Sequence, residues 1–198
     1  MDVAVIKLGV GNTASVMFAL ERLGCNAVLT SDPAQVRDAE RVILPGVGAA
    51  GAAMRLLTQS GIADVLRDFV RPLLGICLGQ QVFYDRSEEG AAVGLGLLPG
   101  AVSALKATRE RPSPHMGWSA LRNVRQHPLF EGVRSGDYAY FVHSYACPAD
   151  GSAIAEGEYG ATFAAAVARD NIFGCQFHPE RSGAVGARIL ANFLALPC

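Results

Sequence analysis

The sequence has 198 residues, of which 51% are hydrophobic, and its formal net charge is −1 at pH 7. That length supports one well-buried core, most simply a single domain over residues 1–198. The charge balance gives no basic surface for nucleic acid, no apolar run reaches the roughly 18 residues of a membrane span, and the N-terminus has the pattern of a strand rather than a signal peptide. We therefore expect a cytosolic protein that binds neither nucleic acid nor membrane.

The cysteines and histidines show no pattern of a metal site. The five cysteines are an odd number without a CxxC pair, and the four histidines lack the spacing of metal ligands. This distribution argues against a disulfide framework and against a zinc site. We expect the chain to bind no metal.

The first half of the chain alternates between apolar strands and amphipathic helices. Strands are predicted at residues 3–8, 26–30, 41–44 and 73–76, and helices at residues 13–23, 51–58, 62–69 and 79–84. Short strands that alternate with helices predict an α/β fold, with a largely parallel open sheet and helices on both of its faces.

A glycine-containing turn, GVGN, follows the first predicted strand at residues 9–12. It begins like a dinucleotide-binding motif, but Ala14 stands where the third glycine belongs, and no acidic residue ends the next strand. We therefore expect no nicotinamide or flavin cofactor. The turn instead predicts that Asn12 lies at the rim of the sheet, where α/β folds bind ligands and partners.

The central motif of the sequence is GICLG at residues 75–79, where a buried strand meets a helix at Cys77. GxCxG is the cysteine counterpart of the GxSxG nucleophile elbow, in which a sharp turn lifts the nucleophile out of the sheet. The N–H of Leu78 would supply part of an oxyanion hole, and the start of the helix would favour the thiolate. The alternative is a small cysteine buried at a glycine-rich turn.

A second glycine-rich turn, Pro45-Gly46-Val47-Gly48, ends the strand predicted at residues 41–44. Such a turn can expose backbone N–H groups to a ligand, because glycine reaches conformations that other residues avoid. Acyl chemistry needs a second oxyanion donor from a separate loop. We expect this turn to supply it if the turn lies beside Cys77, although it is equally consistent with a plain connection.

The second half of the chain has a different pattern. Short β-like segments separated by Gly, Pro and Asp turns occur near residues 102–105, 118–124, 138–147, 153–156, 161–168 and 172–177. They predict antiparallel strands and hairpins. A final helix at residues 184–196 carries one apolar stripe that is expected to pack on the sheet.

A second candidate catalytic segment, GCQFHPE, occupies residues 174–180. On an extended chain the side chains of His178 and Glu180 project to the same face, with Pro179 on the other. Glu180 would then fix the tautomer of His178, whose other nitrogen would face a thiol. Alone, the tripeptide is consistent with an ordinary turn at the end of a strand. Together with Cys77 it predicts a nucleophilic acyl-transfer triad.

GICLGQQ followed about a hundred residues later by FHPE resembles the class I, or triad, glutamine amidotransferases. Within that group, five further motifs resemble the glutaminase subunits of imidazole glycerol phosphate synthase: GVGN at 9–12, LPGVG at 44–48, PHMGW at 114–118, YFVHSY at 140–145 and FGCQFHPERS at 173–182. The resemblance covers essentially the whole chain, with the motifs in order.

The resemblance implies a glutaminase that cleaves the side-chain amide of glutamine. Cys77 would be the nucleophile, His178 the acid and base, and Glu180 the residue that orients His178. The oxyanion would be stabilised by the N–H of Leu78 and one from the turn of Gly46, Val47 and Gly48. Substrate contacts would come from Gln81, Glu89 and the backbone around Ser144 and Tyr145. An exposed glutamate after a helix is also ordinary surface, so Glu89 has a second interpretation.

The resemblance further implies a partner, a (β/α)₈-barrel cyclase that forms a heterodimer with this chain and uses the ammonia. The sequence has no P-loop and no second domain in which ammonia could react, which agrees with an acceptor site on another protein. Asn12, Trp118 and Arg181 are implied at the interface. Trp118, the only tryptophan, would otherwise be a core aromatic residue.

This chain departs from the family pattern at three positions. It has Gln80, Ser119 and Arg181 where methionine, asparagine and lysine are common. Three other interpretations stay open: an amidotransferase subunit that serves a different synthase, a catalytically silent regulatory subunit on the same scaffold, and a cysteine peptidase on a related fold.

Overall fold

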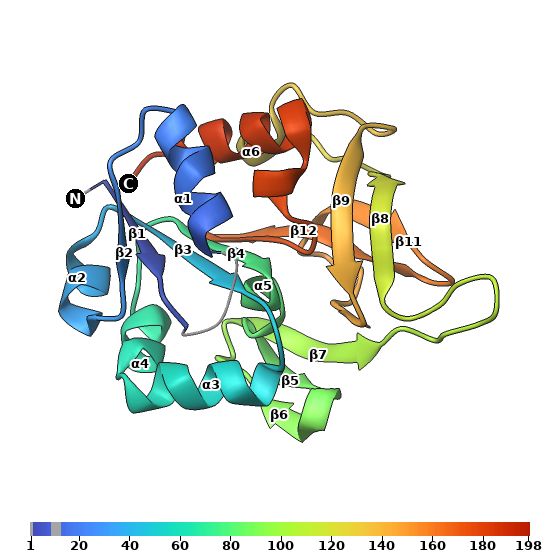
Figure 1. Ribbon diagram of the computed structural model, residues 1–198, viewed down its shortest axis with the longest axis horizontal. Helices are drawn as coiled ribbons and strands as arrows, with labels where there is room; N and C mark the ends of the chain where they lie inside the picture. Colours follow the sequence, from blue (N-terminus) through green and yellow to red (C-terminus); the bar gives the residue numbers. More distant parts are fainter. Residues whose placement is uncertain (1, 9–12) are drawn as a thin grey trace.

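The computed structural model describes residues 2–8 and 13–198. A seven-stranded sheet forms its centre, with strand order β11-β12-β13-β4-β3-β1-β2 (Figure 1). Strands β2, β1, β3, β4 and β13 pair in parallel, and β12 and β11 extend the sheet in antiparallel fashion. The bounds are β1 Val3–Ile6, β2 Ala27–Thr30, β3 Arg41–Gly46, β4 Leu73–Cys77, β11 Ala153–Glu158, β12 Thr162–Arg169 and β13 Ile172–Cys175. The predicted sheet is therefore confirmed.

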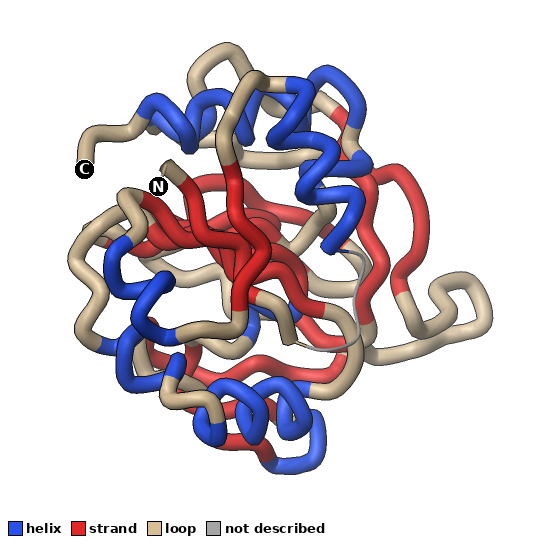
Figure 2. Tube along the Cα trace, turned by 60° about the vertical axis from the view of Figure 1, so that its left-hand side comes forward, coloured by secondary structure: helices blue, strands red, loops and turns tan. Residues whose placement is uncertain are grey.

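Helices cover both faces of this sheet (Figures 1 and 2). Alternate strand residues face opposite ways, so Ala4 and Ile6 join one core cluster and Val3 and Val5 the other. Residues of α2, α3 and α4 belong to the first cluster, and residues of α1 and α6 to the second. The helices are α1 Thr13–Arg22, α2 Pro33–Asp38, α3 Ala50–Gln59, α4 Ile62–Arg67, α5 Leu78–Gln81 and α6 Gly183–Ala195.

Helix α2 is an element that the sequence analysis did not predict. Asp32 caps it, accepting a 2.9 Å hydrogen bond from the N–H of Ala34, and Pro33 occupies its first turn. Its six residues bury only Val36, so the segment has no apolar stripe to detect. The capping pair Asp32-Pro33 was the available signal.

The helix predicted after Cys77 is shorter than expected. It was predicted at residues 79–84, but α5 ends at Gln81, and Tyr84 begins strand β5, Tyr84–Ser87. Tyr84 is fully buried and pairs with Leu98 of β7, Leu98–Ala104. Tertiary pairing and burial therefore override the local helical pattern at this position.

The second half adds two smaller sheets beside the central one. One has strand order β10-β7-β5-β6, and the other is a hairpin of β8, His115–Ala120, and β9, Tyr138–His143. The remaining elements are β6 Ala92–Val93, β10 Tyr145–Ala146 and three short 3₁₀ turns at Glu89–Ala91, Pro128–Phe130 and Pro179–Arg181. The predicted antiparallel strands are confirmed, although β5 and β7 pair in parallel.

Helix α6 packs as predicted, with Ile189, Leu190 and Phe193 buried. It also buries Gly186, where an added Cβ would lie 1.9 Å from the carbonyl oxygen of Pro179. Only glycine permits this close approach of α6 to the turn at Pro179–Arg181.

We predict that Gly186→Ala lowers the free energy of unfolding by about 1–3 kcal/mol, although alanine is the better helix former, because the added methyl group overpacks against Pro179. Gly51→Ala is the matched control, since a Cβ there meets no atom closer than 3.9 Å. It should raise stability by up to about 1 kcal/mol. Urea unfolding measures the stability of both variants. A Gly186→Ala variant more stable than the wild type would contradict the close approach of α6 to Pro179.

Candidate active site

Cys77 lies on a strained turn between β4 and α5. Its backbone has φ 56° and ψ −111°, a conformation that non-glycine residues rarely adopt. The flanking glycines permit the turn to pack closely. An added Cβ at Gly79 would lie 1.8 Å from the carbonyl oxygen of Leu44, and one at Gly75 would lie 2.5 Å from the carbonyl carbon of Gly79. The predicted nucleophile elbow is therefore present, and its geometry depends on both glycines.

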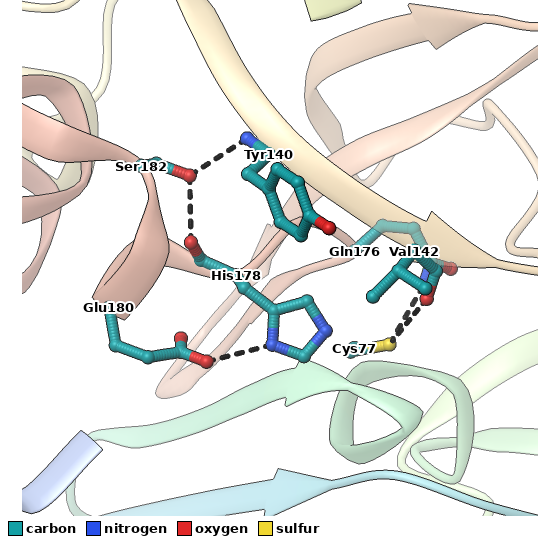
Figure 3. Close-up of polar contacts among 7 residues, drawn as sticks. All are labelled: Cys77, Tyr140, Val142, Gln176, His178, Glu180 and Ser182. Atoms are coloured by element: carbon teal, nitrogen blue, oxygen red, sulfur yellow. Dashed lines mark hydrogen bonds and ion pairs between the residues drawn. The ribbon is translucent and has the colours of Figure 1, made fainter. Parts of the chain in front are cut away.

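His178 and Glu180 form a buried pair beside Cys77 (Figure 3). The Nδ1 atom of His178 lies 2.8 Å from Oε1 of Glu180, and the two side chains are 6% and 2% exposed. The Nε2 atom is buried and makes no hydrogen bond to any residue in the described part of the chain. A carboxylate on one nitrogen leaves the other on the side of the thiol, which is the arrangement a general base requires.

The backbone between His178 and Glu180 differs from the prediction. An extended chain was expected, but Pro179–Arg181 forms a 3₁₀ turn, because proline is favoured in the first turn of a helix. The hydroxyl of Ser182 stabilises this turn, donating a 2.7 Å hydrogen bond to the carbonyl oxygen of His178 and accepting one of 2.9 Å from the N–H of Tyr140 (Figure 3). The pair is brought together by this turn and not by the alternation of a strand.

The protonation of His178 is set by its two neighbours. Burial disfavours the imidazolium, but interactions with Cys77 and Glu180 outweigh it and raise the pKa of His178 to about 10. A protonated ring between a sulfur and a carboxylate is poised to donate its proton to a leaving group.

Two polar contacts hold the side chain of Cys77. Its Sγ atom lies 3.7 Å from the carbonyl oxygen of Val142, and the side-chain amide of Gln176 donates to Sγ over the same distance (Figure 3). Sequence analysis did not predict a role for Gln176. Its only signal was its place two residues before His178, in an otherwise apolar segment.

Cys77 lines a cavity of about 270 Å³. The cavity lies just below the roughly 300–1,000 Å³ of pockets for drug-sized ligands, so it suits a small substrate. Most of the predicted site residues line the cavity: Cys77, His178, Leu78, Val47, Gly48, Gln81, Glu89, Ser144 and Tyr145. Pro114, Val142 and His143 complete the lining. The structure thus brings together residues from widely separated parts of the chain.

Among the described residues, four predicted ones are not part of this lining: Glu180, Gly46, Trp118 and Arg181. Glu180 lies behind His178, and Gly46 pairs with Cys77 in the β3–β4 register, where its own added Cβ would lie 2.9 Å from Cβ of Leu78. Trp118 is 55% exposed and packs against Tyr140, whose ring also contacts the guanidinium of Arg181 at 5.1 Å. Trp118 is therefore no core residue. Asn12 lies outside the described residues.

Glu89 has a structural role in addition to its place in the cavity. Its Oε2 atom accepts a 2.6 Å hydrogen bond from the N–H of Ala50, in the first turn of α3. This contact ties the residue to the helix that follows Val47 and Gly48, and the side chain is only partly exposed. Glu89 is thus no ordinary surface glutamate.

Gln81 is oriented by its neighbours. Its amide nitrogen donates to the carbonyl oxygen of Tyr145 at 2.8 Å and to Oε1 of Gln176 at 3.0 Å. Because both partners accept, the amide has one favourable orientation. Gln80 instead donates to the carbonyl oxygen of Ala164 at 3.2 Å and is not part of the cavity lining.

Other features of the structure do not compete with this site. A larger cavity of about 660 Å³ is lined by residues 124–128 and 130–135, none of which is a cysteine. Across residues 2–8 and 13–198, no three or more His, Cys, Asp or Glu side chains are grouped so that they could hold a metal ion. In the same part of the chain, no helix is both long enough and apolar enough to cross a membrane.

An α/β sheet that carries a cysteine on a strand-to-helix elbow, beside a buried His–Glu pair, is the arrangement of triad acyl-transfer proteins. The family model for class-I glutamine amidotransferases matches residues 4–196. The chain belongs to this family, as its motifs indicated.

Named relatives refine the comparison. The protein named imidazole glycerol phosphate synthase subunit HisH from Shewanella oneidensis is 45% identical over 212 residues, covering 98% of this chain and 96% of that protein. Imidazole glycerol phosphate synthase subunit HisH 2 from Legionella pneumophila is 47% identical over 194 residues, covering 98% of each.

Solved structures agree on the fold. A crystal structure of a glutamine amidotransferase matches with a TM-score of 0.77 at 21% identity, covering 98% of both chains. A glutamine amidotransferase from Thermotoga maritima matches with a TM-score of 0.62 at 16% identity, covering 95% of this chain and 80% of that one.

Proposed function

We propose that this chain is the glutaminase subunit of an imidazole glycerol phosphate synthase, which hydrolyses glutamine to glutamate and ammonia for histidine biosynthesis. The observation that carries the proposal is the small cavity in which Cys77, His178 and the expected glutamine contacts meet. The relatives named as HisH subunits, at 45–47% identity over nearly the full chain, support the choice of synthase.

The chemistry follows from the geometry of the triad. The sulfur of Cys77 attacks the carboxamide carbon of glutamine, and the C–N bond breaks to leave a glutamyl thioester. His178 gives its proton to the departing ammonia and then takes a proton from the water that hydrolyses the thioester. Glu180, 2.8 Å from Nδ1, orients the ring through both steps.

The negative oxygen of each tetrahedral intermediate needs hydrogen-bond donors. We assign this role to the N–H of Leu78 and to a backbone N–H of the turn formed by Gly46, Val47 and Gly48. The position of Leu78, Val47 and Gly48 in the cavity lining supports the assignment. Gly46 contributes by letting β3 pack closely against Leu78.

The remaining polar groups of the cavity suit the two ends of glutamine. The carboxylate of Glu89 attracts the α-amino group of the substrate, and one of its oxygens is already held by Ala50. Gln81 and the backbone of Ser144 and Tyr145 form the opposite contacts. Fixed polar groups of this kind select one small substrate by geometry.

Ammonia must then reach an acceptor on a second protein. We propose a cyclase subunit with a (β/α)₈ barrel, bound as a heterodimer through the surface of Trp118, Tyr140 and Arg181, with Asn12 as a further contact outside the described residues. An exposed tryptophan packed on a tyrosine that also contacts an arginine supports this choice, because these residue types are enriched in interface hot spots.

The first test of the proposal replaces the nucleophile. Cys77→Ser is expected to reduce glutamine-dependent synthesis by the complex to less than about a thousandth of its normal rate, with synthesis from added ammonium unchanged. Cys198→Ser is the control, because Cys198 is an exposed cysteine, and it should change neither rate. Loss of both activities in Cys77→Ser would show that Cys77 is structural and would overturn the proposal.

The second test concerns the partner surface. Trp118→Ala is expected to weaken binding of the cyclase by about 2 kcal/mol, or roughly thirtyfold in Kd, while thermal unfolding stays unchanged. Val70→Ala is the control, since Val70 is 82% exposed and follows α4, a helix drawn on the opposite side of the molecule from β8 (Figure 1). Titration calorimetry with the cyclase measures both variants. Equal affinities of Trp118→Ala and the wild-type chain for the cyclase would show that Trp118 is not part of the interface.

A further inference from the structure

A chain of hydrogen bonds runs through two buried histidines at the rim of the cavity. His115 and His143 face each other across the β8–β9 hairpin and are 3% and 5% exposed. Nε2 of His115 lies 2.8 Å from the hydroxyl oxygen of Ser119, and Nδ1 of His115 lies 3.1 Å from Nε2 of His143. Nδ1 of His143 lies 2.8 Å from the carbonyl oxygen of Tyr145.

The carbonyl group of Tyr145 fixes the direction of every bond in this chain. A carbonyl oxygen only accepts, so Nδ1 of His143 carries the proton and donates to it. Nε2 of His143 must then accept from the Nδ1–H of His115, whose own Nε2 accepts from the hydroxyl of Ser119. One tautomer of each ring satisfies all three contacts.

Both rings are neutral near pH 7, as this direction requires. Burial lowers the pKa of His115. Burial also lowers the pKa of His143, to about 4, although the hydrogen bond to Tyr145 opposes the shift. A second proton on His143 would lie on Nε2 and would face the Nδ1–H of His115 at 3.1 Å, where neither group can accept a hydrogen bond.

The carbonyl oxygen of Tyr145 also receives a bond from the cavity side, because the amide of Gln81 donates to it at 2.8 Å. His143 and Gln81 therefore hold one acceptor from two directions. All three residues line the cavity beside Cys77. A shift of the Tyr145 carbonyl would consequently disturb the amide of Gln81 as well.

We propose that His143, supported by His115, is a positioning residue for the substrate: it fixes the carbonyl of Tyr145 and, through it, the amide of Gln81 that contacts glutamine. This inference rests on the proposed glutaminase function. The residues act on binding rather than on the bond-breaking step, so their loss is expected to raise KM for glutamine and to leave kcat nearly unchanged.

A purely structural role is the competing explanation. The ring of His115 stacks on Phe141 and Tyr159 at centroid distances of 5.1 and 4.2 Å, and His143 contacts Phe163 at 5.0 Å. If only this packing mattered, substitutions would change stability and would not distinguish polar from apolar replacements.

The test compares two replacements of His143 in the complex with the cyclase, by steady-state glutamate release. His143→Leu removes the donor to Tyr145, and we expect KM for glutamine to rise about tenfold with kcat within about threefold of wild type. His143→Asn keeps an N–H near the position of Nδ1 and should hold the rise in KM below about threefold. His127→Leu, the same change at a histidine that lines the other cavity, should leave KM unchanged.

His115→Phe provides a second variant if His143→Leu does not fold, which thermal unfolding detects. It retains the stacking and removes the donor to His143, so KM should again rise several-fold. Equal KM values in His143→Leu, His143→Asn and wild type, or equal increases in both variants, would overturn the inference. A wild-type complex without glutaminase activity would instead refute the proposed function itself, and the inference with it.

Discussion

The site depends on the close packing of two backbone segments around Cys77. The carbonyl oxygen of Leu44 on β3 approaches Gly79 so closely that an added Cβ would lie 1.8 Å away. This approach holds the first turn of α5 against β3, and Cys77 takes up the resulting strain at φ 56°. Strand β4 pairs in parallel with β13 on one side and with β3 on the other, so the sheet holds Cys77 in that conformation.

The second half of the chain brings His178, the proposed base, to Cys77, the proposed nucleophile. Strand β13 pairs with β4, and the 3₁₀ turn that follows β13 directs His178 and Glu180 toward Cys77. Helix α6 packs on the turn through Gly186, and Ser182 joins it to β9. The hairpin of β8 and β9 contacts both segments, through Tyr140 to Ser182 and through the carbonyl oxygen of Val142 to Cys77, and it carries the exposed Trp118 on its surface.

Much of this arrangement could be predicted because the responsible signals are local. Apolar strands, the glycines around Cys77 and the stripe of α6 are each visible within a few residues. The 3₁₀ turn at Pro179–Arg181 was predicted as extended chain, because the two-residue spacing of His178 and Glu180 also fits the alternation of a strand. Gln176 and the His115–His143 pair were missed, since Gln176 meets Cys77 from 99 residues away and His115 meets His143 from 28 residues away. Only the folded chain shows which buried polar groups meet.

Glutamine hydrolysis by this chain is proposed to be coupled to its partner. We predict that glutamate release by the chain alone is nearly absent, because hydrolysis without an acceptor wastes glutamine and the glycine turn at Val47 and Gly48 can withhold an oxyanion donor. Glutamate release is therefore to be measured for the chain alone, with the cyclase, and with the cyclase and its ligand, the substrate that accepts the ammonia. Strong stimulation by both additions together is the predicted result. High activity of the chain alone, or no response to the cyclase and its ligand, would contradict the account.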